Sequence, residues 1–139
     1  MKPVLLDTGV IVALLDRSER FHARAVHALE SLEQPLATCE PVIAESCYLL
    51  RAIPGAAETV LANLEQGIFQ IPLQLNQAAA PIRAILRKYR DVPADLADAC
   101  LIHLADALET GEILTLDSDF SRYRWRRNRP FQLLIPLKQ

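Results

Sequence analysis

The sequence predicts an α/β fold in which a central parallel sheet carries helices on both faces. Short apolar runs, each long enough for one strand, alternate with longer segments of helical periodicity. Two of these runs stop at polar turns that begin with aspartate. The chain has 139 residues, of which 51% are hydrophobic and 23% charged, so it can bury a substantial core. We therefore expect a single domain over residues 1–139.

The first third of the chain indicates two strands and two helices. Residues 3–6 form an apolar burst that stops at Asp7, which predicts a buried strand ending in a turn. Residues 10–15 are apolar on all sides and predict a short buried helix, with Thr8 as its N-cap. Helical spacing of apolar side chains predicts an amphipathic helix over residues 21–32. The next predicted strand covers residues 36–39.

The middle of the chain is predominantly helical. Pro41 suits the first helical position, and the helix then covers residues 42–52 until Pro54-Gly55 ends it. A further helix covers residues 56–64 and is followed by a strand over residues 68–75. Asn76 is the expected cap of a helix that runs to about residue 89.

The last third begins with a break at residues 91–93. Asp95 is then the expected N-cap of a strong helix over residues 96–108, which Gly111 closes. Two more apolar runs predict strands at residues 112–116 and 131–135.

Acidic side chains occur near the ends of apolar segments at distant points in the chain. They are Asp7, Glu45, Asp98 and Asp117, with Asp119 close behind. In an open α/β sheet, ligands bind beyond the carboxyl ends of the strands, and this edge is where all four segments can meet. Carboxylates on one small patch repel each other, so a divalent cation is expected to neutralise them. An all-oxygen cluster selects Mg²⁺ or Mn²⁺, which supports the hydrolysis of phosphodiesters.

Each of these acids also has a structural interpretation when it is taken alone. Asp7 could be an ordinary turn residue, and Asp98 could simply favour the positive N-terminus of its helix. Glu45 could lie on a solvated face, although its helix is mostly apolar. The joint pattern, more than any one residue, favours a site.

Other classes of site lack support in the sequence. The three histidines have no zinc-like spacing to cysteine and indicate structural roles; they are His22, His27 and His103. The chain has no G-x-G-x-x-G, P-loop or G-x-S-x-G pattern. Its three cysteines show no C-x-x-C spacing, which fits free thiols in a cytoplasmic protein. No segment is long enough to span a bilayer, so we expect no membrane association.

Five motifs in a fixed order carry a family resemblance. They are Leu5-Leu6-Asp7-Thr8-Gly9, Pro41-Val42-Ile43-Ala44-Glu45, Lys88-Tyr89-Arg90-Asp91-Val92-Pro93, Leu96-Ala97-Asp98-Ala99-Cys100-Leu101 and Leu114-Thr115-Leu116-Asp117-Ser118-Asp119-Phe120. On these motifs the chain resembles the PIN-domain ribonucleases, and closely the VapC-type toxins of bacterial toxin–antitoxin pairs. The resemblance implies a three-layer α/β/α fold with a central parallel sheet and an endoribonuclease site that depends on Mg²⁺ or Mn²⁺.

The resemblance also implies roles for individual residues. The acidic positions of the family fall on Asp7, Glu45, Asp98 and Asp117. Asp7 and Asp98 are expected to contact the metal directly. The supporting positions are Thr8, Thr115 and Asp119, of which the last could share the role of Asp117. Gly9 stands where serine or asparagine is common in the family, which removes one possible polar contact.

The partners implied by the resemblance are an RNA substrate, a cognate VapB-like antitoxin and a second copy of the chain in a homodimer. Two alternatives stay open: a housekeeping PIN nuclease in RNA processing, and a non-catalytic PIN-like binding module. The small size of the chain favours the toxin, and the four filled acidic positions argue against a non-catalytic module.

A basic segment follows the last acidic motif. Residues 122–129 contain five arginines with Tyr123 and Trp125 between them. Such a segment could bind RNA, with arginines on phosphates and aromatic rings stacked on unpaired bases. It could equally be a solvated loop that balances the acidic residues and contacts a protein partner.

Overall fold

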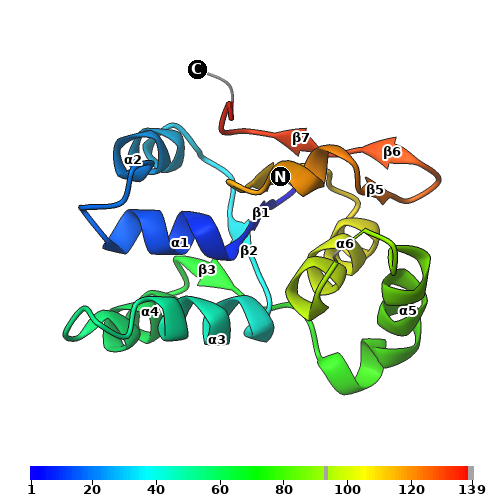
Figure 1. Ribbon diagram of the computed structural model, residues 1–139, viewed down its shortest axis with the longest axis horizontal. Coiled ribbons are helices and arrows are strands. Elements are labelled where there is room, and N and C mark those ends of the chain that lie inside the picture. The colour runs from blue at the N-terminus through cyan, green and yellow to red at the C-terminus, as the bar shows by residue number, and fades with distance from the viewer. Residues whose placement is uncertain (93, 138–139) are drawn as a thin grey trace.

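A parallel sheet of short strands lies at the centre of the molecule (Figure 1). In the computed structural model, which describes residues 1–92 and 94–137, the sheet has the order β3-β2-β1-β4-β7 and all its pairings are parallel. Its strands are β1 (Val4–Leu6), β2 (Leu36–Ala37), β3 (Phe69–Gln70), β4 (Glu112–Leu114) and β7 (Gln132–Leu133). The predicted parallel α/β fold is therefore confirmed, although most strands are shorter than the apolar runs that predicted them.

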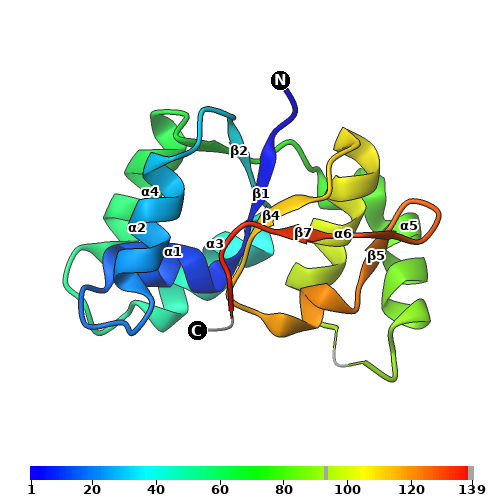
Figure 2. The ribbon, with the colours of Figure 1, turned by 90° about the horizontal axis from the view of Figure 1, so that it is seen from above.

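Helices cover both faces of this sheet. They are α1 (Thr8–Leu15), α2 (His22–Glu30), α3 (Glu40–Leu49), α4 (Ala56–Glu65), α5 (Leu75–Lys88) and α6 (Leu96–Leu108). The first four lie on one side of the sheet, and α5 and α6 lie on the other (Figures 1 and 2). Within the described ranges, none of these helices is both long and apolar enough to cross a membrane.

The direction of chain progression reverses beside β1. From β1 the chain moves outward through β2 to β3, and it returns to pair β4 with the other side of β1. Leu6 lies opposite Leu114 in this pairing, and the backbone N–H of Asp7 continues it by donating to Leu114 O at 3.0 Å. In a doubly wound sheet, such a reversal opens a crevice at the carboxyl ends of the two strands. Asp7 and Asp117 therefore leave the sheet at the same crevice.

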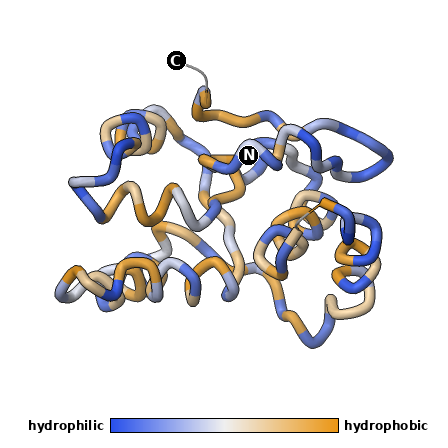
Figure 3. Tube along the Cα trace, in the orientation of Figure 1, coloured by the Kyte–Doolittle hydropathy of each residue, from blue (hydrophilic) through white to orange (hydrophobic). Residues whose placement is uncertain are grey.

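The core consists of the strands and the buried face of α6. Leu5 and Leu6 are at most 1% exposed, and Leu101 and Leu104 on α6 are equally well buried. Figure 3 shows the same partition, with apolar residues concentrated in the central strands and α6 and hydrophilic residues at the tip of the β5–β6 loop. Because this packing holds α6 against β1, truncating one of these leucines to alanine should cost about 2–5 kcal/mol.

The structure corrects several local predictions at helix ends. Asp7, and not Thr8, is the N-cap of α1, because its Oδ1 accepts the Thr8 N–H at 2.8 Å. Helix α3 begins at Glu40, so Pro41 is its second residue, and it ends at Leu49. Gln74 takes the N-cap position of α5, so Asn76 lies within the helix. The predicted cap at Asp95 is confirmed.

Further corrections concern the chain around α6. Residues 91 and 92 form a turn, and Pro93 of the predicted break lies outside the described residues. Helix α6 ends at Leu108 with Glu109 in the left-handed region at φ 55°, so Gly111 does not close it. A Cβ at Gly111 would clash with the Trp125 ring, so this glycine leaves room for a tryptophan.

The basic segment forms a small hairpin that the sequence did not predict. Strands β5 (Arg124–Trp125) and β6 (Arg129–Pro130) pair antiparallel in a separate sheet. The turn places Arg126 at φ 40° and Asn128 at φ 71°. The Trp125 ring N–H donates to Pro130 O at 3.1 Å, which fixes the ring across the hairpin.

Candidate active site

Asp7 is held at the crevice by a donor at the start of α1 and by a donor in the residue that follows β4. It follows β1, its Oδ1 accepts the Thr8 N–H, and its Oδ2 accepts the Thr115 hydroxyl at 2.7 Å. The residue is only 7% exposed. Burial raises the pKa of Asp7 from 3.8 to about 6, against the lowering effect of the hydrogen bonds from Thr115 and Thr8. The negative charges of Asp117 and Glu45 raise it further.

Asp98 reaches the same crevice from the first turn of α6. It forms a reciprocal capping box with Asp95, in which Asp98 N donates to Asp95 Oδ1 at 2.9 Å and Asp95 N donates to Asp98 Oδ2 at 3.2 Å. The Tyr123 hydroxyl donates to the same Oδ2 at 3.2 Å. Burial raises the pKa of Asp98 to about 7, and the charges of Asp95, Asp7 and Asp117 add to the rise. Burial and the adjoining Asp98 carboxylate also raise the pKa of Tyr123.

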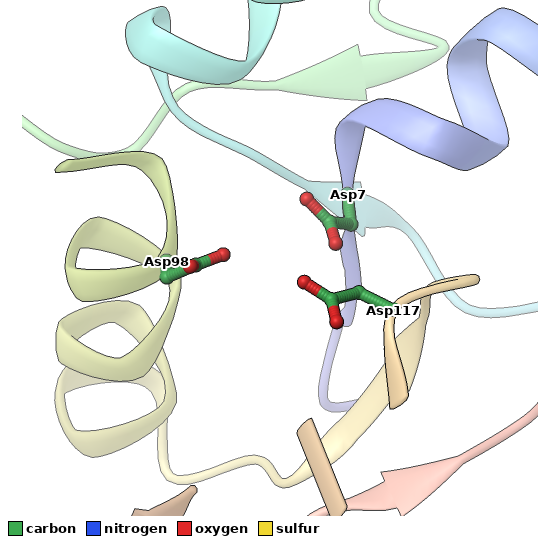
Figure 4. Close-up of side chains that lie close together, drawn as sticks. All are labelled: Asp7, Asp98 and Asp117. Atoms are coloured by element: carbon green, nitrogen blue, oxygen red, sulfur yellow. The ribbon is translucent and has the colours of Figure 1, made fainter. Parts of the chain in front are cut away.

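Asp117 completes a group of three carboxylates. It follows β4, its backbone N–H donates to the Thr115 hydroxyl at 3.0 Å, and its Oδ1 accepts the Asp119 N–H at 2.9 Å. Asp7, Asp98 and Asp117 each offer one oxygen, and these oxygens lie within 4.8 Å of one another. Figure 4 shows their carboxylates, which come from three different elements, pointing toward a common centre.

Glu45 lies beside this group but outside its tight core. Its Oε1 accepts the Thr8 hydroxyl at 2.6 Å, which links α3 to the start of α1. The pocket that it shares with the three aspartates is lined by Asp7, Thr8, Gly9, Glu45, Leu49, Asp95, Asp98, Leu116 and Asp117. The structure thus brings together all four acids that the sequence singled out.

Asp119 has a different environment from its neighbour Asp117. Its carboxylate forms an ion pair with Arg122 at 2.6 Å, and it does not line the pocket. Sequence spacing could not separate these two acids, and the structure shows that Asp117 lines the pocket whereas Asp119 pairs with Arg122. Gly9, in contrast, lines the pocket, and a Cβ there would make only ordinary contact, 3.5 Å from the Leu116 Cβ.

The chemistry of this pocket fits a hard divalent cation. Among the described residues, no lysine or arginine lines it. Burial is the main cause of the raised pKa values of Asp7 and Asp98, and the charges of the neighbouring carboxylates raise these values further. Three converging carboxylate oxygens without a cationic partner are the kind of donor set that Mg²⁺ or Mn²⁺ binds.

Comparison with known proteins decides the family. The PIN domain family matches residues 4–126, which cover all four acids. The chain belongs to the PIN domain family. PIN-domain nucleases use divalent metals, in agreement with the carboxylate group.

Two individual proteins show which members of the family this PIN domain is similar to. It is 32% identical over 120 residues to Ribonuclease VapC26 of Mycobacterium tuberculosis, covering 82% of this chain and 86% of that protein. Its fold is similar to the crystal structure of M. tuberculosis VapC20, described as a toxin that cleaves the sarcin-ricin loop. The TM-score is 0.80 at 19% identity, covering 91% of this chain and 99% of that one. The VapC-type resemblance predicted from the sequence is confirmed.

Sequence reasoning misjudged both aromatic side chains of the basic segment and missed that one of them contacts the site. Tyr123 is fully buried and contacts Asp98, and Trp125 is 8% exposed. Neither ring is available to stack on a base, so that part of the RNA-guide prediction is wrong. Arginines alternate with aromatic residues both on surfaces that bind nucleic acids and in hairpins with one face in the core. The sequence pattern therefore does not distinguish these two structures.

Four of the five arginines in residues 122–129 have partners within the protein. Arg126 pairs with Glu109 at 2.7 Å, and Arg122 pairs with Asp119. Arg124 donates to Ser121 O and Tyr123 O, both at 2.9 Å. The Arg129 guanidinium lies 5.3 Å from the Trp125 ring centroid. These contacts favour the structural interpretation of the segment.

Proposed function

We propose that this PIN domain is an endoribonuclease that depends on Mg²⁺ or Mn²⁺ and acts in the cytoplasm as the toxin of a VapBC-type toxin–antitoxin pair. The observation that carries the proposal is the convergence of Asp7, Asp98 and Asp117, whose ligand oxygens lie within 4.8 Å of one another. The identity to a protein named as a VapC ribonuclease supports the substrate class. A bound divalent cation would polarise a phosphoryl oxygen and lower the pKa of a water for in-line attack.

Each side chain of the pocket has a defined task in this proposal. Asp7, Asp98 and Asp117 hold the cation, and Thr115 keeps two of them in place through its hydrogen bonds to Asp7 Oδ2 and Asp117 N. Glu45, held by the Thr8 hydroxyl, orients or deprotonates a water at the edge of the group. Asp119 neutralises Arg122 and has no part in the chemistry.

The decisive experiment compares cleavage of total RNA by purified protein with Mg²⁺, with Mn²⁺ and with a chelator. The unmodified chain should cut in the presence of either ion and stop with the chelator. Asp7→Asn and Asp98→Asn should lower cleavage more than about 100-fold, beyond the effect typical of outer partners of metal ligands. Sequencing the cut ends identifies the target RNA. Cleavage that survives the chelator would overturn the metal-dependent mechanism.

The proposed protein partners are a VapB-like antitoxin and a second copy of this chain. Exposed apolar side chains support a docking role for α3 and α4, because Tyr48 is 62%, Leu49 53% and Leu61 53% exposed. The molar mass of the purified protein, alone and with its neighbouring gene product, tests both partners. The housekeeping nuclease would be favoured if the protein is a monomer, does not bind the product of the neighbouring gene and still cuts RNA.

A further inference from the structure

Tyr123 belongs to a cluster of aromatic rings, and its hydroxyl contacts Asp98 on α6. It lies after the 3₁₀ turn η1 (Ser118–Ser121) and is fully buried. Its ring meets Phe120 edge to face at 5.0 Å and 87°, and Tyr89 at 5.1 Å and 71°. Phe120 makes the same kind of contact with Phe131. These contacts pack the ring on two edges, with its hydroxyl directed at Asp98 on α6.

The hydroxyl of Tyr123 forms a hydrogen bond with one of the two carboxylate oxygens of Asp98. It donates to Asp98 Oδ2 at 3.2 Å, and the same oxygen accepts the Asp95 N–H. Within residues 1–92 and 94–137, no protein group donates to the other oxygen, Oδ1. The two carboxylate oxygens of Asp98 are therefore unequal: one is saturated by the protein and one is left for a ligand.

We propose that Tyr123 is a positioning residue that fixes the Asp98 carboxylate so that one oxygen faces the protein and the other faces the cation. This inference rests on the metal-dependent function proposed above. The hydroxyl is costly at this position unless it has a partner, because a fully buried donor without one loses its hydrogen bonds to water. Phe120 and Phe131 show that the cluster accepts phenylalanine. Tyr123, whose para position faces Asp98, carries the hydroxyl that the two phenylalanines lack.

Tyr89 offers a matched control within the same cluster. Its hydroxyl accepts the Arg124 N–H at 2.9 Å, so it holds backbone of the hairpin but does not touch any carboxylate. Tyr89→Phe and Tyr123→Phe each remove one buried hydroxyl and keep the ring. A role in stability alone would give both variants the same effect on the metal, namely none.

The test measures Mn²⁺ binding directly, by the electron paramagnetic resonance signal of free Mn²⁺ in titrations without RNA. Tyr123→Phe should bind Mn²⁺ about 10-fold more weakly than the unmodified protein, as is typical when an outer partner of a metal ligand is removed. Tyr89→Phe should bind it with unchanged affinity. The melting temperatures of the metal-free proteins confirm that both variants fold. RNA cleavage by Tyr123→Phe should need about 10-fold more Mn²⁺ for half its maximal rate and recover at saturation.

The outcomes separate this inference from the function on which it rests. If the unmodified protein binds Mn²⁺ and Asp98→Asn does not, but Tyr123→Phe binds like the unmodified protein, the positioning role is overturned and the metal site stands. An equal loss in Tyr89→Phe would also overturn it, because the effect would then belong to the cluster as a whole. If the unmodified protein binds no Mn²⁺, the metal site and this inference fall together.

Discussion

The acidic pocket and the arginine hairpin lie next to each other, but they differ in whether their charged side chains have partners of opposite charge. In the pocket, Asp7, Asp98 and Asp117 converge without a cation from the described residues. In the hairpin, Arg122 and Arg126 each have a carboxylate partner at 2.6 or 2.7 Å. Both regions are conspicuous in the sequence, but the three aspartates of the pocket have no cationic partner among the residues that line it, whereas these two arginines are paired. Uncompensated charge that the fold holds in place indicates a ligand, and paired charge indicates structure.

The largest effect is expected from a comparison of two acids, two positions apart, of which one lies in the pocket and the other is paired with an arginine. Asp117→Asn should lower RNA cleavage more than about 100-fold, because it removes one of three converging oxygens. Asp119→Asn should lower it less than about 5-fold, since an exposed ion pair such as that with Arg122 contributes only about 0–1 kcal/mol. Cleavage rates at saturating Mg²⁺ measure both. Equal losses would show that the pocket extends across the turn.

The second test follows the stability of the metal-free protein with pH. The pKa of Asp7 is raised from 3.8 to about 6 and that of Asp98 to about 7, so between pH 4 and 7 the folded state holds more protons than the unfolded state. Stability from these groups is therefore fully present below pH about 4 and is lost as the pH rises through 6 and 7. The loss should be about 2–3 kcal/mol for Asp7.

Urea unfolding from pH 4 to 8 gives this profile. The double variant Asp7→Asn, Asp98→Asn is the control, and it should lack this part of the pH dependence. Millimolar Mg²⁺ should restore the stability of the unmodified protein at pH 8 and leave the double variant unchanged. Identical profiles for the two proteins would mean that the protein itself compensates the pocket charge.

The third test concerns the hydroxyl that connects two of the acids. Thr115→Val removes the donor to Asp7 Oδ2 and the acceptor of Asp117 N, so Mn²⁺ affinity should fall about 10-fold. Thr115→Ser keeps the hydroxyl and should retain the affinity. Calorimetric titration with Mn²⁺ measures both variants. If the serine variant loses as much as the valine variant, the methyl group and its packing matter more than the hydrogen bonds.

The sequence was sufficient for the fold class and for the four acids of the pocket. Apolar runs that stop at aspartate mark the carboxyl ends of parallel strands, and a reversal of strand order beside β1 brings two such ends together. Asp98 and Glu45 follow because their helices begin at the same edge. The aspartate at the end of an apolar run is a local pattern in the sequence, whereas the strand order that places two such ends side by side comes from the structure.

The remaining features depend on contacts between distant positions. The hydrogen bond from Tyr123 to Asp98 spans 25 positions, and no local pattern reports it. The hairpin has strands of two residues, and Trp125 is fixed by Pro130 and by the space that Gly111 leaves. Asp7 replaced Thr8 as a cap because both are good capping residues and only the backbone conformation separates them.

The smallest expected effect tests the hairpin side of the contrast. Replacing Arg122, Arg126 and Arg129 with glutamine should change the salt dependence of RNA binding by less than one phosphate contact, a slope change below about 0.7 for single-stranded RNA. The reason is that each of these arginines already has a carboxylate or aromatic partner in the protein. Filter binding with catalytically inactive Asp98→Asn protein from 50 to 300 mM salt gives the slope. Three lost phosphate contacts would flatten it by about 2. That result would mean that RNA phosphates displace the carboxylate and aromatic partners of these arginines. The hairpin would then be part of the surface that binds the substrate.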